Sequence, residues 1–261
     1  MERTDPFADL AGCTAVVTGA ARGIGLRIAQ ELQSVGMTLL LVDRDGAELE
    51  VACQELAADG QVAGVATTLS TDDCVEPIEE ALAGLPPIAV WVNNAGRVSH
   101  ADAADVDLAE FEEVLRDNTA SALRGSQIAY RAMTAPRDGA AAGGAVVNVT
   151  SLVAARALPQ RLSYATSKAA LENVTRYTAA EWAPLGIRVN AVAPGYIDTR
   201  LTAWPDDDPR AVAKKATLAT LPMRRAGSPG DIARTVLYLV SSLSAYTVGQ
   251  TVFVDGGWHL V

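Results

Sequence analysis

TAVVTGAARGIG, residues 14–25, is the stretch that decides the fold, and an amphipathic run, LRIAQELQSVG, follows it at 26–36. The β-branched residues at 14–18 predict a short strand and the periodic run predicts a helix, so the glycines form the turn between them. Such glycines let the backbone approach a pyrophosphate, and a helix N-terminus offers it free N–H groups and a positive dipole. The stretch therefore predicts a dinucleotide-binding turn with contacts from Gly19, Arg22, Gly23, Ile24 and Gly25.

An acidic residue follows the second predicted strand. The apolar run TLLLV at 38–42 ends in Asp43, 18 residues beyond Gly25. A carboxylate at this point accepts hydrogen bonds from the adenosine ribose hydroxyls and repels a 2′-phosphate, so NAD is favoured over NADP. Arg22 and Arg44 work against this preference, because either could reach a phosphate. The alternative role for Asp43 is that of a turn residue or a helix N-cap.

The rest of the chain alternates strand-like and helix-like runs. Strands are predicted at 38–42, 62–67, 88–92, 145–150, 187–192 and 251–258. Helices are predicted at 45–60, from about Thr71, and at 108–133, 164–183 and 231–242. This alternation implies an α/β fold, a Rossmann-like doubly wound sheet of seven parallel strands with helices on both faces. With 261 residues, 49% of them hydrophobic, the chain should form a single domain over residues 1–261.

Two segments depart from this regular pattern. Pro77 would fall near the second turn of the helix expected from Thr71, where proline removes a backbone hydrogen bond. That helix either starts late, near Val75, or is kinked. Residues 200–226 show weak periodicity, which is typical of a substrate-binding lid; the alternative is a poorly ordered surface excursion.

Asparagines occupy two further positions of interest. Asn93-Asn94-Ala95-Gly96 follows the strand at 88–92, and an asparagine amide there can tie neighbouring strands together. Asn118 lies in the middle of the helix predicted at 108–133, where asparagine competes for backbone hydrogen bonds, so we expect a functional kink. The simpler alternatives are a plain turn and a solvent-facing helix residue.

The residues best suited to chemistry are Ser151, Tyr164 and Lys168. Tyr164 and Lys168 stand four apart in a segment free of Gly and Pro, and a helix puts both on one face. A phenol, with a pKa of about 10, is a poor acid at neutral pH, and an ammonium one turn away favours the phenolate. Ser151 follows the strand at 145–150, so its hydroxyl should emerge where such sheets bind ligands. The three side chains could converge on one carbonyl oxygen, although an ordinary surface pair of Tyr164 and Lys168 is the alternative.

Composition argues against several other classes of function. A formal net charge of -10 and a pI of about 4.7 give little support for a nucleic-acid or anionic membrane partner. Cys13, Cys53 and Cys74 are odd in number and widely spaced, which indicates thiols in a reducing compartment. Two histidines give no zinc-ligand pattern, so no metal is expected. No apolar signal core or membrane-length run occurs, and we expect a cytoplasmic protein.

Together these motifs resemble the short-chain dehydrogenase/reductase family in its short single-domain form. The resemblance covers almost the whole chain and implies an NAD(P)-dependent oxidoreductase that transfers a hydride to or from a CH–OH carbon. It rests on motifs in family order: Thr18-Gly19-x-x-x-Gly23-x-Gly25, Asn93-Asn94-Ala95-Gly96, Asn118, Ser151, Tyr164-x-x-x-Lys168, Pro194-Gly195 and Val254-Asp255-Gly256-Gly257.

The resemblance also implies a role for individual residues. Tyr164 would be the general acid/base, Ser151 would hold the substrate oxygen, and Lys168 would bind the nicotinamide ribose while acidifying Tyr164. Asn118 would keep a water in a proton relay from Lys168 to solvent. Further cofactor contacts would come from Thr68, Leu69, Asn94, Gly96, Pro194, Gly195, Ile197 and Thr199. The threonine stands where the family often has an adenine-facing aspartate, so adenine selectivity should be weaker.

Within the family, the carboxyl-terminal half resembles 3-oxoacyl carrier-protein reductases and related secondary-alcohol dehydrogenases. Those reductases usually prefer NADP, against Asp43, and dock an acidic carrier through a basic residue where this chain has Leu185. We therefore expect NAD and a largely apolar secondary alcohol or ketone as small-molecule substrate. The expected lining is Leu152, Val153, Leu158, Tyr196 and Trp204.

Two other functions stay open from the sequence. One is NADPH-dependent reduction of a 3-oxoacyl thioester, and the other is a non-catalytic nucleotide-binding protein that keeps the fold. Whatever the function, the resemblance implies a homotetramer, because family members usually pair through the long helices, here 108–133 and 164–183, and the last strand.

Overall fold

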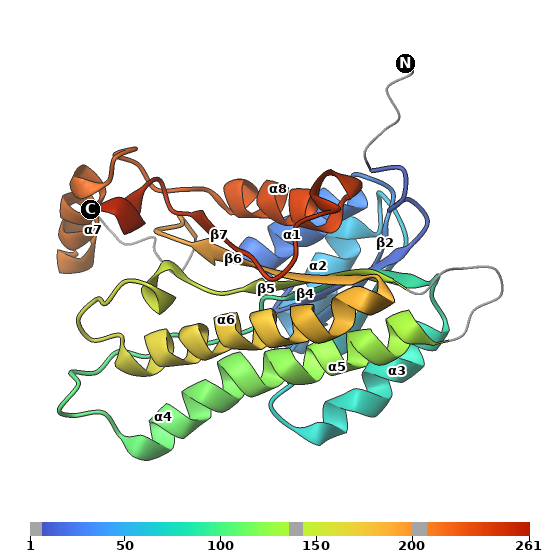
Figure 1. The fold of residues 1–261 in the computed structure, drawn as a ribbon, viewed down its shortest axis with the longest axis horizontal. Coiled ribbons are helices and arrows are strands. Elements are labelled where there is room, and N and C mark those ends of the chain that lie inside the picture. The colour runs from blue at the N-terminus through green and yellow to red at the C-terminus, as the bar shows by residue number, and fades with distance from the viewer. Residues whose placement is uncertain (1–6, 136–142, 200–207) are drawn as a thin grey trace.

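The computed structural model describes residues 7–135, 143–199 and 208–261, and one parallel β-sheet lies at its centre (Figure 1). Its strands are β1 (Thr14–Thr18), β2 (Thr38–Asp43), β3 (Val62–Ala66), β4 (Ile88–Asn93), β5 (Gly144–Val149), β6 (Ile187–Pro194) and β7 (Thr251–Val254). They lie in the order β3-β2-β1-β4-β5-β6-β7, and every neighbouring pair is parallel. The chain proceeds outward from β1 on one side and from β4 on the other, so a ligand crevice is expected between their carboxyl ends. The predicted seven-stranded doubly wound fold is confirmed.

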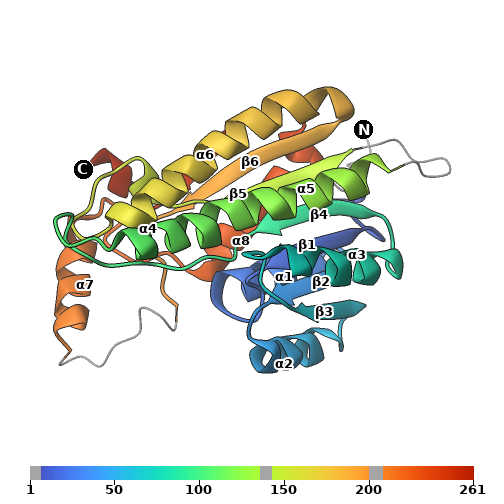
Figure 2. The same ribbon diagram turned by 90° about the horizontal axis from the view of Figure 1, so that it is seen from below.

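Helices cover both faces of the sheet (Figure 2). Their bounds are α1 (Gly23–Gln33), α2 (Gly46–Leu56), α3 (Val75–Ala83), α4 (Leu108–Leu115), α5 (Ser121–Thr134), α6 (Leu162–Trp182), α7 (Pro209–Thr220) and α8 (Pro229–Val240). Helices α1, α2 and α8 pack on one face, and α3, α5 and α6 pack on the other. None of the helices in the described residues has the length and apolar content needed to span a bilayer.

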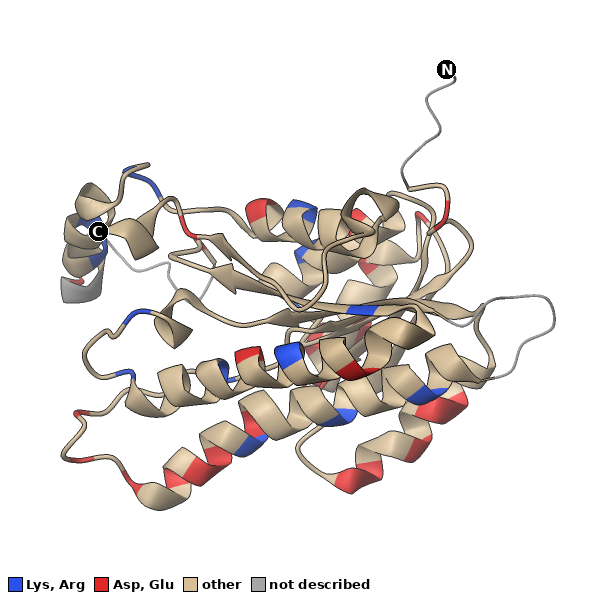
Figure 3. Cartoon of the chain, viewed as in Figure 1, with Lys and Arg blue, Asp and Glu red and all other residues tan. Residues whose placement is uncertain are grey.

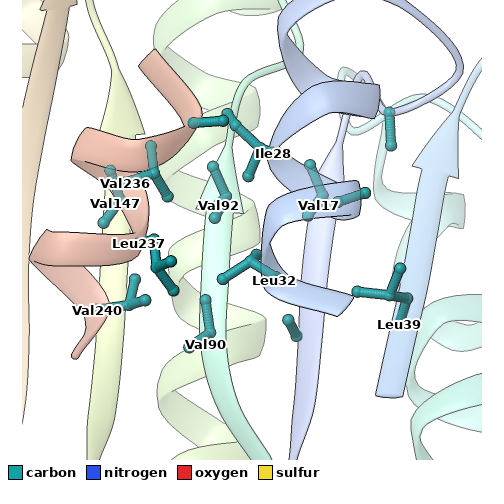
Figure 4. Close-up of a cluster of buried hydrophobic side chains, with 14 of the residues drawn as sticks. Val17, Ile28, Leu32, Leu39, Val90, Val92, Val147, Val236, Leu237 and Val240 are labelled. Carbon is teal, nitrogen blue, oxygen red and sulfur yellow. The ribbon is translucent and has the colours of Figure 1, made fainter. Parts of the chain in front are cut away.

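Buried aliphatic side chains fill the layer between the sheet and helices α1 and α8 (Figure 4). Val17, Val92 and Val147 point from the central strands into this layer and are fully buried. They meet Ile28 of α1 and Val236 of α8, which are also fully buried. Burying each such side chain contributes about 1.5–3 kcal/mol. Because helices cover both faces, the strands are continuous apolar runs rather than alternating ones.

A buried polar network connects the sheet to α6 on the other face. Trp91 Nε1 donates to Asn93 Oδ1 at 2.7 Å, and Asn93 Nδ2 donates to Asn148 Oδ1 of the next strand at 2.8 Å. Asn148 Nδ2 in turn donates to Thr175 Oγ1 of α6 at 2.8 Å. A fully partnered buried network of this kind fixes the relative position of the elements it joins. Strands β4 and β5 and helix α6 are therefore held in one arrangement.

Local chemistry explains how two helices begin. A 3₁₀ turn, Asp72–Cys74, precedes α3, so Pro77 lies in the first helical turn, where its missing N–H needs no partner. The late start near Val75 is the alternative that the structure adopts. Helix α8 begins at Pro229, two residues before the predicted start. Its N-cap, Ser228, forms a capping box with Asp231, which places the acid in the third helical position.

Part of the segment 200–226 forms a helix that the sequence analysis did not predict. Residues 209–220 make α7, which stands at one end of the sheet near the carboxyl terminus (Figure 1). It is joined to the loop after β6 by Lys214, whose Nζ lies 2.8 Å from Asp198 Oδ1. Residues 200–207 of the proposed lid, with Trp204, lie outside the described residues.

Candidate active site

The turn after β1 is shaped to hold a phosphate group. Gly19 and Gly23 both have a φ of 63°, a left-handed conformation that glycine adopts without strain. A Cβ on Gly25 would lie 2.1 Å from Gly19 O, so the turn packs on α1 too closely for a side chain. No side chain of the described residues caps α1, and its first N–H groups are donors for an anion. These residues fit the pyrophosphate of a dinucleotide.

Asp43 ends β2 beside this turn and is tied to it. Its Oδ2 accepts the N–H of Ala21 at 3.1 Å, and its Oδ1 accepts the N–H of Asp45 at 3.0 Å. Each oxygen keeps a lone pair for a ribose hydroxyl. Asp45, rather than Asp43, caps α2, and it also lies 3.8 Å from Arg22. One of the two arginines near the acid is thus paired with a carboxylate, while Arg44 is exposed.

The segment after β4 bridges the central strands and approaches Asn118 and Lys168. Asn94 Nδ2 donates to the carbonyl oxygens of Thr18 and the next residue at 3.0 and 2.9 Å, which confirms the predicted amide tie. At Gly96, a Cβ would lie 2.8 Å from Asn118 Oδ1 and 3.4 Å from Lys168 Nζ. Only glycine lets this segment approach both side chains without displacing one of them.

Ser151 and Lys168 meet at the carboxyl end of β5. Ser151 is buried just beyond the strand, and its Oγ accepts the N–H of Val153 at 3.4 Å. Lys168 projects from α6, is 4% exposed, and donates from Nζ to Val149 O at 2.9 Å. Burial lowers the pKa of Lys168 to about 8. The lysine is therefore anchored to the strand that presents the serine.

Tyr164 lies one turn before Lys168 on α6, and Lys168 Nζ is 5.8 Å from the centroid of its ring. Burial raises the pKa of Tyr164, while a hydrogen bond with the Ser151 side chain and the charge of Arg161 lower it. From the sequence, this acidifying effect was expected of Lys168. In the structure Ser151 and Arg161 lower the pKa, and the Lys168 ammonium also donates to Val149 O, so its effect on Tyr164 stays a prediction.

Asn118 connects the loop after β4 to the helix that carries the tyrosine. It lies in a π-helical segment, Arg116–Ala120, between α4 and α5, so the predicted interruption is confirmed. Its Oδ1 accepts the N–H of Arg97 at 2.7 Å, and its Nδ2 donates to Ser167 Oγ at 2.9 Å. Ser167 Oγ donates to Tyr164 O at 2.7 Å. Asn118 is fully buried, so the solvent-facing alternative is wrong.

The loop after β6 packs against the end of β7. The N–H of Gly195 donates to Val254 O at 3.1 Å, and a Cβ on Gly195 would lie 2.6 Å from Asp255 Cα. The two motifs Pro194-Gly195 and Val254–Gly257 therefore lie against each other. Beyond them Ile197 is buried and Thr199 is partly exposed.

The structure also places the predicted adenine-side contacts and the expected substrate lining. Thr68 follows β3 near the sheet edge, is exposed, and donates from Oγ1 to Ser70 Oγ at 3.1 Å. Leu69 is buried in the apolar cluster under α3 and α5. Of the expected substrate lining, the structure buries Leu152 and Val153, leaves Leu158 and Tyr196 partly exposed, and does not describe Trp204.

Several residues near the tyrosine were not predicted to belong to the site. Arg161 immediately precedes α6, and its guanidinium contacts the imidazole of His100. Arg156 lies 5.9 Å above the ring of Trp258, which is 6.3 Å from the ring of Tyr196. The available signal was two arginines within the stretch 151–168 of an otherwise acidic chain.

Comparisons with known proteins agree with this geometry. A family model described as enoyl-(acyl carrier protein) reductase matches residues 19–259. The galactitol 2-dehydrogenase (L-tagatose-forming) of Cereibacter sphaeroides is 37% identical over 251 residues, which are 95% of this chain and 96% of that protein. The 3-oxoacyl-[acyl-carrier-protein] reductase of Aquifex aeolicus (strain VF5) is 33% identical over 251 residues, covering 95% of this chain and 98% of the relative.

A solved structure supports the same assignment. The crystal structure of a presumptive gluconate dehydrogenase from Agrobacterium tumefaciens matches with a TM-score of 0.90 at 30% sequence identity. The match covers 99% of this chain and 100% of the other. The chain therefore belongs to the short-chain dehydrogenase/reductase family, whose members are NAD(P)-dependent oxidoreductases that act on CH–OH groups.

Proposed function

We propose that this protein is an NAD-dependent oxidoreductase that transfers a hydride between its cofactor and a secondary alcohol or the corresponding ketone. The observation that carries the proposal is the meeting of Ser151, Tyr164 and Lys168 at the carboxyl end of β5. This group lies beside a glycine turn whose conformation fits a pyrophosphate. A phenol held by a hydroxyl and near cations is suited to exchange a proton with a carbinol oxygen.

Each residue has one task in the proposed oxidation. The Ser151 hydroxyl donates a hydrogen bond to the substrate oxygen, and Tyr164, as the phenolate, accepts the carbinol proton. A nicotinamide held there would supply the acceptor for the hydride, or its donor in the reverse reaction. Lys168, fixed by its bond to Val149 O, binds the nicotinamide ribose. Asn118 holds a water that passes the proton from Lys168 to solvent.

The choice of NAD rests on Asp43. Its carboxylate, tied to the glycine turn through Ala21, would repel a 2′-phosphate at the ribose. NADPH-dependent reduction of a 3-oxoacyl thioester is the second candidate. It is supported by the Aquifex aeolicus reductase, at 33% identity, and by Arg44, which is exposed beside the acid.

We also propose a homotetramer paired through the long helices and the last strand. Leu108 on α4 and Tyr177 on α6 are 75% and 67% exposed in the single chain, as expected of residues that a partner covers. Light scattering should give a mass of four 27.2 kDa chains, and the mass of one chain would contradict the proposal.

We also propose that the protein is cytoplasmic, because the free thiols of its three cysteines fit a reducing compartment.

Replacing Tyr164 by phenylalanine tests the function directly. Y164F removes the hydroxyl that exchanges the proton, so kcat for alcohol oxidation should fall about 10²–10⁴-fold. The affinity of Y164F for NADH, measured by quenching of protein fluorescence, should stay within about twofold of the wild-type value. The control is Y246F, which alters a fully exposed tyrosine outside α6 and should leave kcat unchanged.

The wild-type protein should be assayed with NAD and a panel of secondary alcohols that includes galactitol and a 3β-hydroxysteroid. Full activity in Y164F would refute the role of the tyrosine. NAD binding without turnover of any alcohol, ketone or 3-oxoacyl thioester would support the non-catalytic alternative.

Replacing Lys168 by methionine should separate stability from activity. Burial lowers the pKa of Lys168 from 10.5 to about 8, so below pH 8 the folded state bears the cost of an ammonium out of water. Between pH 8 and 10.5 only the unfolded chain holds the proton, so wild-type stability should rise relative to the variant.

At pH 7, K168M should therefore raise the free energy of unfolding by about 1–3 kcal/mol, after subtracting the lost bond to Val149 O. Urea denaturation at pH 7 and pH 10 measures this difference, which should shrink at the higher pH while activity is lost at both. A variant less stable than wild type at pH 7 would show that the charge stabilises the fold.

Replacing Asp43 by asparagine tests the cofactor preference. D43N keeps the size of the side chain but removes the charge that opposes a 2′-phosphate. The ratio of NADPH to NADH dissociation constants, from fluorescence titration, should fall by about tenfold or more. D59N removes a charge from the exposed turn between α2 and β3 and should leave the ratio unchanged. Tighter binding of NADPH than NADH by the wild type would favour the thioester-reductase alternative.

A further inference from the structure

Arg161 occupies a position from which it can contact the substrate of the proposed reaction. It immediately precedes α6, one helical turn before Tyr164, and its backbone pairs with Ala101 in an isolated bridge. Its guanidinium contacts the imidazole of His100, and its charge acts on the phenols of both Tyr164 and Tyr196. The cation therefore lies between the proposed acid/base and the loop after β6.

No carboxylate of the described part of the chain pairs with Arg161; its charged and polar neighbours are His100 and the two tyrosines. Other arginines are paired, such as Arg97 with Glu113 at 3.1 Å. Burial lowers the pKa of Arg161, and the same burial with the nearby cation lowers the pKa of His100. At neutral pH the imidazole adds a hydrogen-bonding group but no charge, so the guanidinium is partly desolvated without an anion to balance it.

The surroundings of Arg161 add positive charge to this side of the molecule. Arg156 lies against Trp258, whose carbonyl it contacts, and Lys214 Nζ is 5.8 Å from the ring centroid of Tyr196. Figure 3 shows Lys and Arg on the segment before α6 and on α7, whereas the acidic residues gather along α3 and α4. Lys214 is paired with Asp198 at 2.8 Å, whereas Arg156 and Arg161 form no ion pair with a carboxylate of the described residues.

We propose that Arg161 is a substrate-binding residue that holds an oxyanion, so the enzyme acts on small secondary alcohols or ketones that carry a carboxylate or a phosphate. This rests on the proposed function, because Tyr164 and Ser151 must hold the carbinol oxygen at the same time. The planar guanidinium matches either oxyanion through two parallel hydrogen bonds. Because the charge of Arg161 acts on the phenol of Tyr164, we expect the charged group of the substrate to lie within a few bonds of the carbinol.

Direct binding to the protein saturated with NAD tests this inference without requiring turnover. The probes are 4-oxopentanoate, its neutral counterpart 2-pentanone, and acetonyl phosphate, compared by calorimetry. We expect at least one of the two anions to bind about tenfold or more tightly than the neutral ketone, and the tighter one identifies the oxyanion. Equal binding of all three probes would overturn the proposal.

Variants then assign the effect to Arg161. R161Q should reduce the ratio of anionic to neutral affinity about 10- to 100-fold. R161K keeps the charge but not the planar pair of donors, so it should retain part of the preference for the anion. The control R176Q removes an exposed arginine farther along α6, which contacts Asn173, and should leave the ratio unchanged. A wild-type ratio in R161Q would also overturn the proposal.

Turnover separates this inference from the proposed function. With 4-hydroxypentanoate and 2-pentanol as substrates, R161Q should lower kcat/KM more for the acid than for the alcohol. An equal loss for both would mean that Arg161 acts only through Tyr164, and would refute the oxyanion role. Anion-selective binding by a protein that oxidises no alcohol would instead refute the proposed function and leave Arg161 as a ligand-binding residue.

Discussion

A lysine ammonium buried at the end of a strand is the constraint on which the rest of the site depends. Lys168 is 4% exposed, and its Nζ donates to Val149 O at 2.9 Å. A charge out of water costs several kcal/mol even when it is hydrogen-bonded, so the surrounding structure must hold it there. The lysine can reach this carbonyl only if α6 keeps its rotation and its distance from β5. The packing around α6 therefore both fills the core and holds Lys168 in place at the end of β5.

Hydrogen bonds between named pairs of residues supply that rigidity. Thr175 on α6 accepts from Asn148 of β5 at 2.8 Å, two turns beyond the lysine. Thr119 Oγ1, in the π-helical segment, donates to Ser167 O at 2.8 Å. Aliphatic packing tolerates small shifts of a helix, whereas a buried hydrogen bond fixes both its register and its rotation. Tyr164, the proposed acid/base, is thus positioned by polar contacts to β5 and to the interrupted helix, over a largely apolar core.

Much of the fold and of the site could be predicted, because their signals are local. The glycine turn, the acid that ends β2 and the pair Tyr164-x-x-x-Lys168 each encode their geometry within a few residues. The lysine's actual acceptor could not be predicted, since it is a backbone carbonyl of β5. Arg161 was missed for a related reason: its surroundings include His100 and Tyr196, which lie far away in sequence. Helix α7 has weak periodicity, so its residues carried no clear pattern.

Net charge says little about the charge of a small ligand. At -10 the chain should repel anions, and that argument holds for an extended surface such as a membrane or a nucleic acid. Within a crevice it fails, because charges farther away than about 8–10 Å are screened at physiological salt. What a small anion meets there is the α1 N-terminus, with its free N–H groups, and Arg161 beside the tyrosine. An acidic protein can therefore carry a cationic site, provided that its carboxylates lie elsewhere, as those along α3 and α4 do.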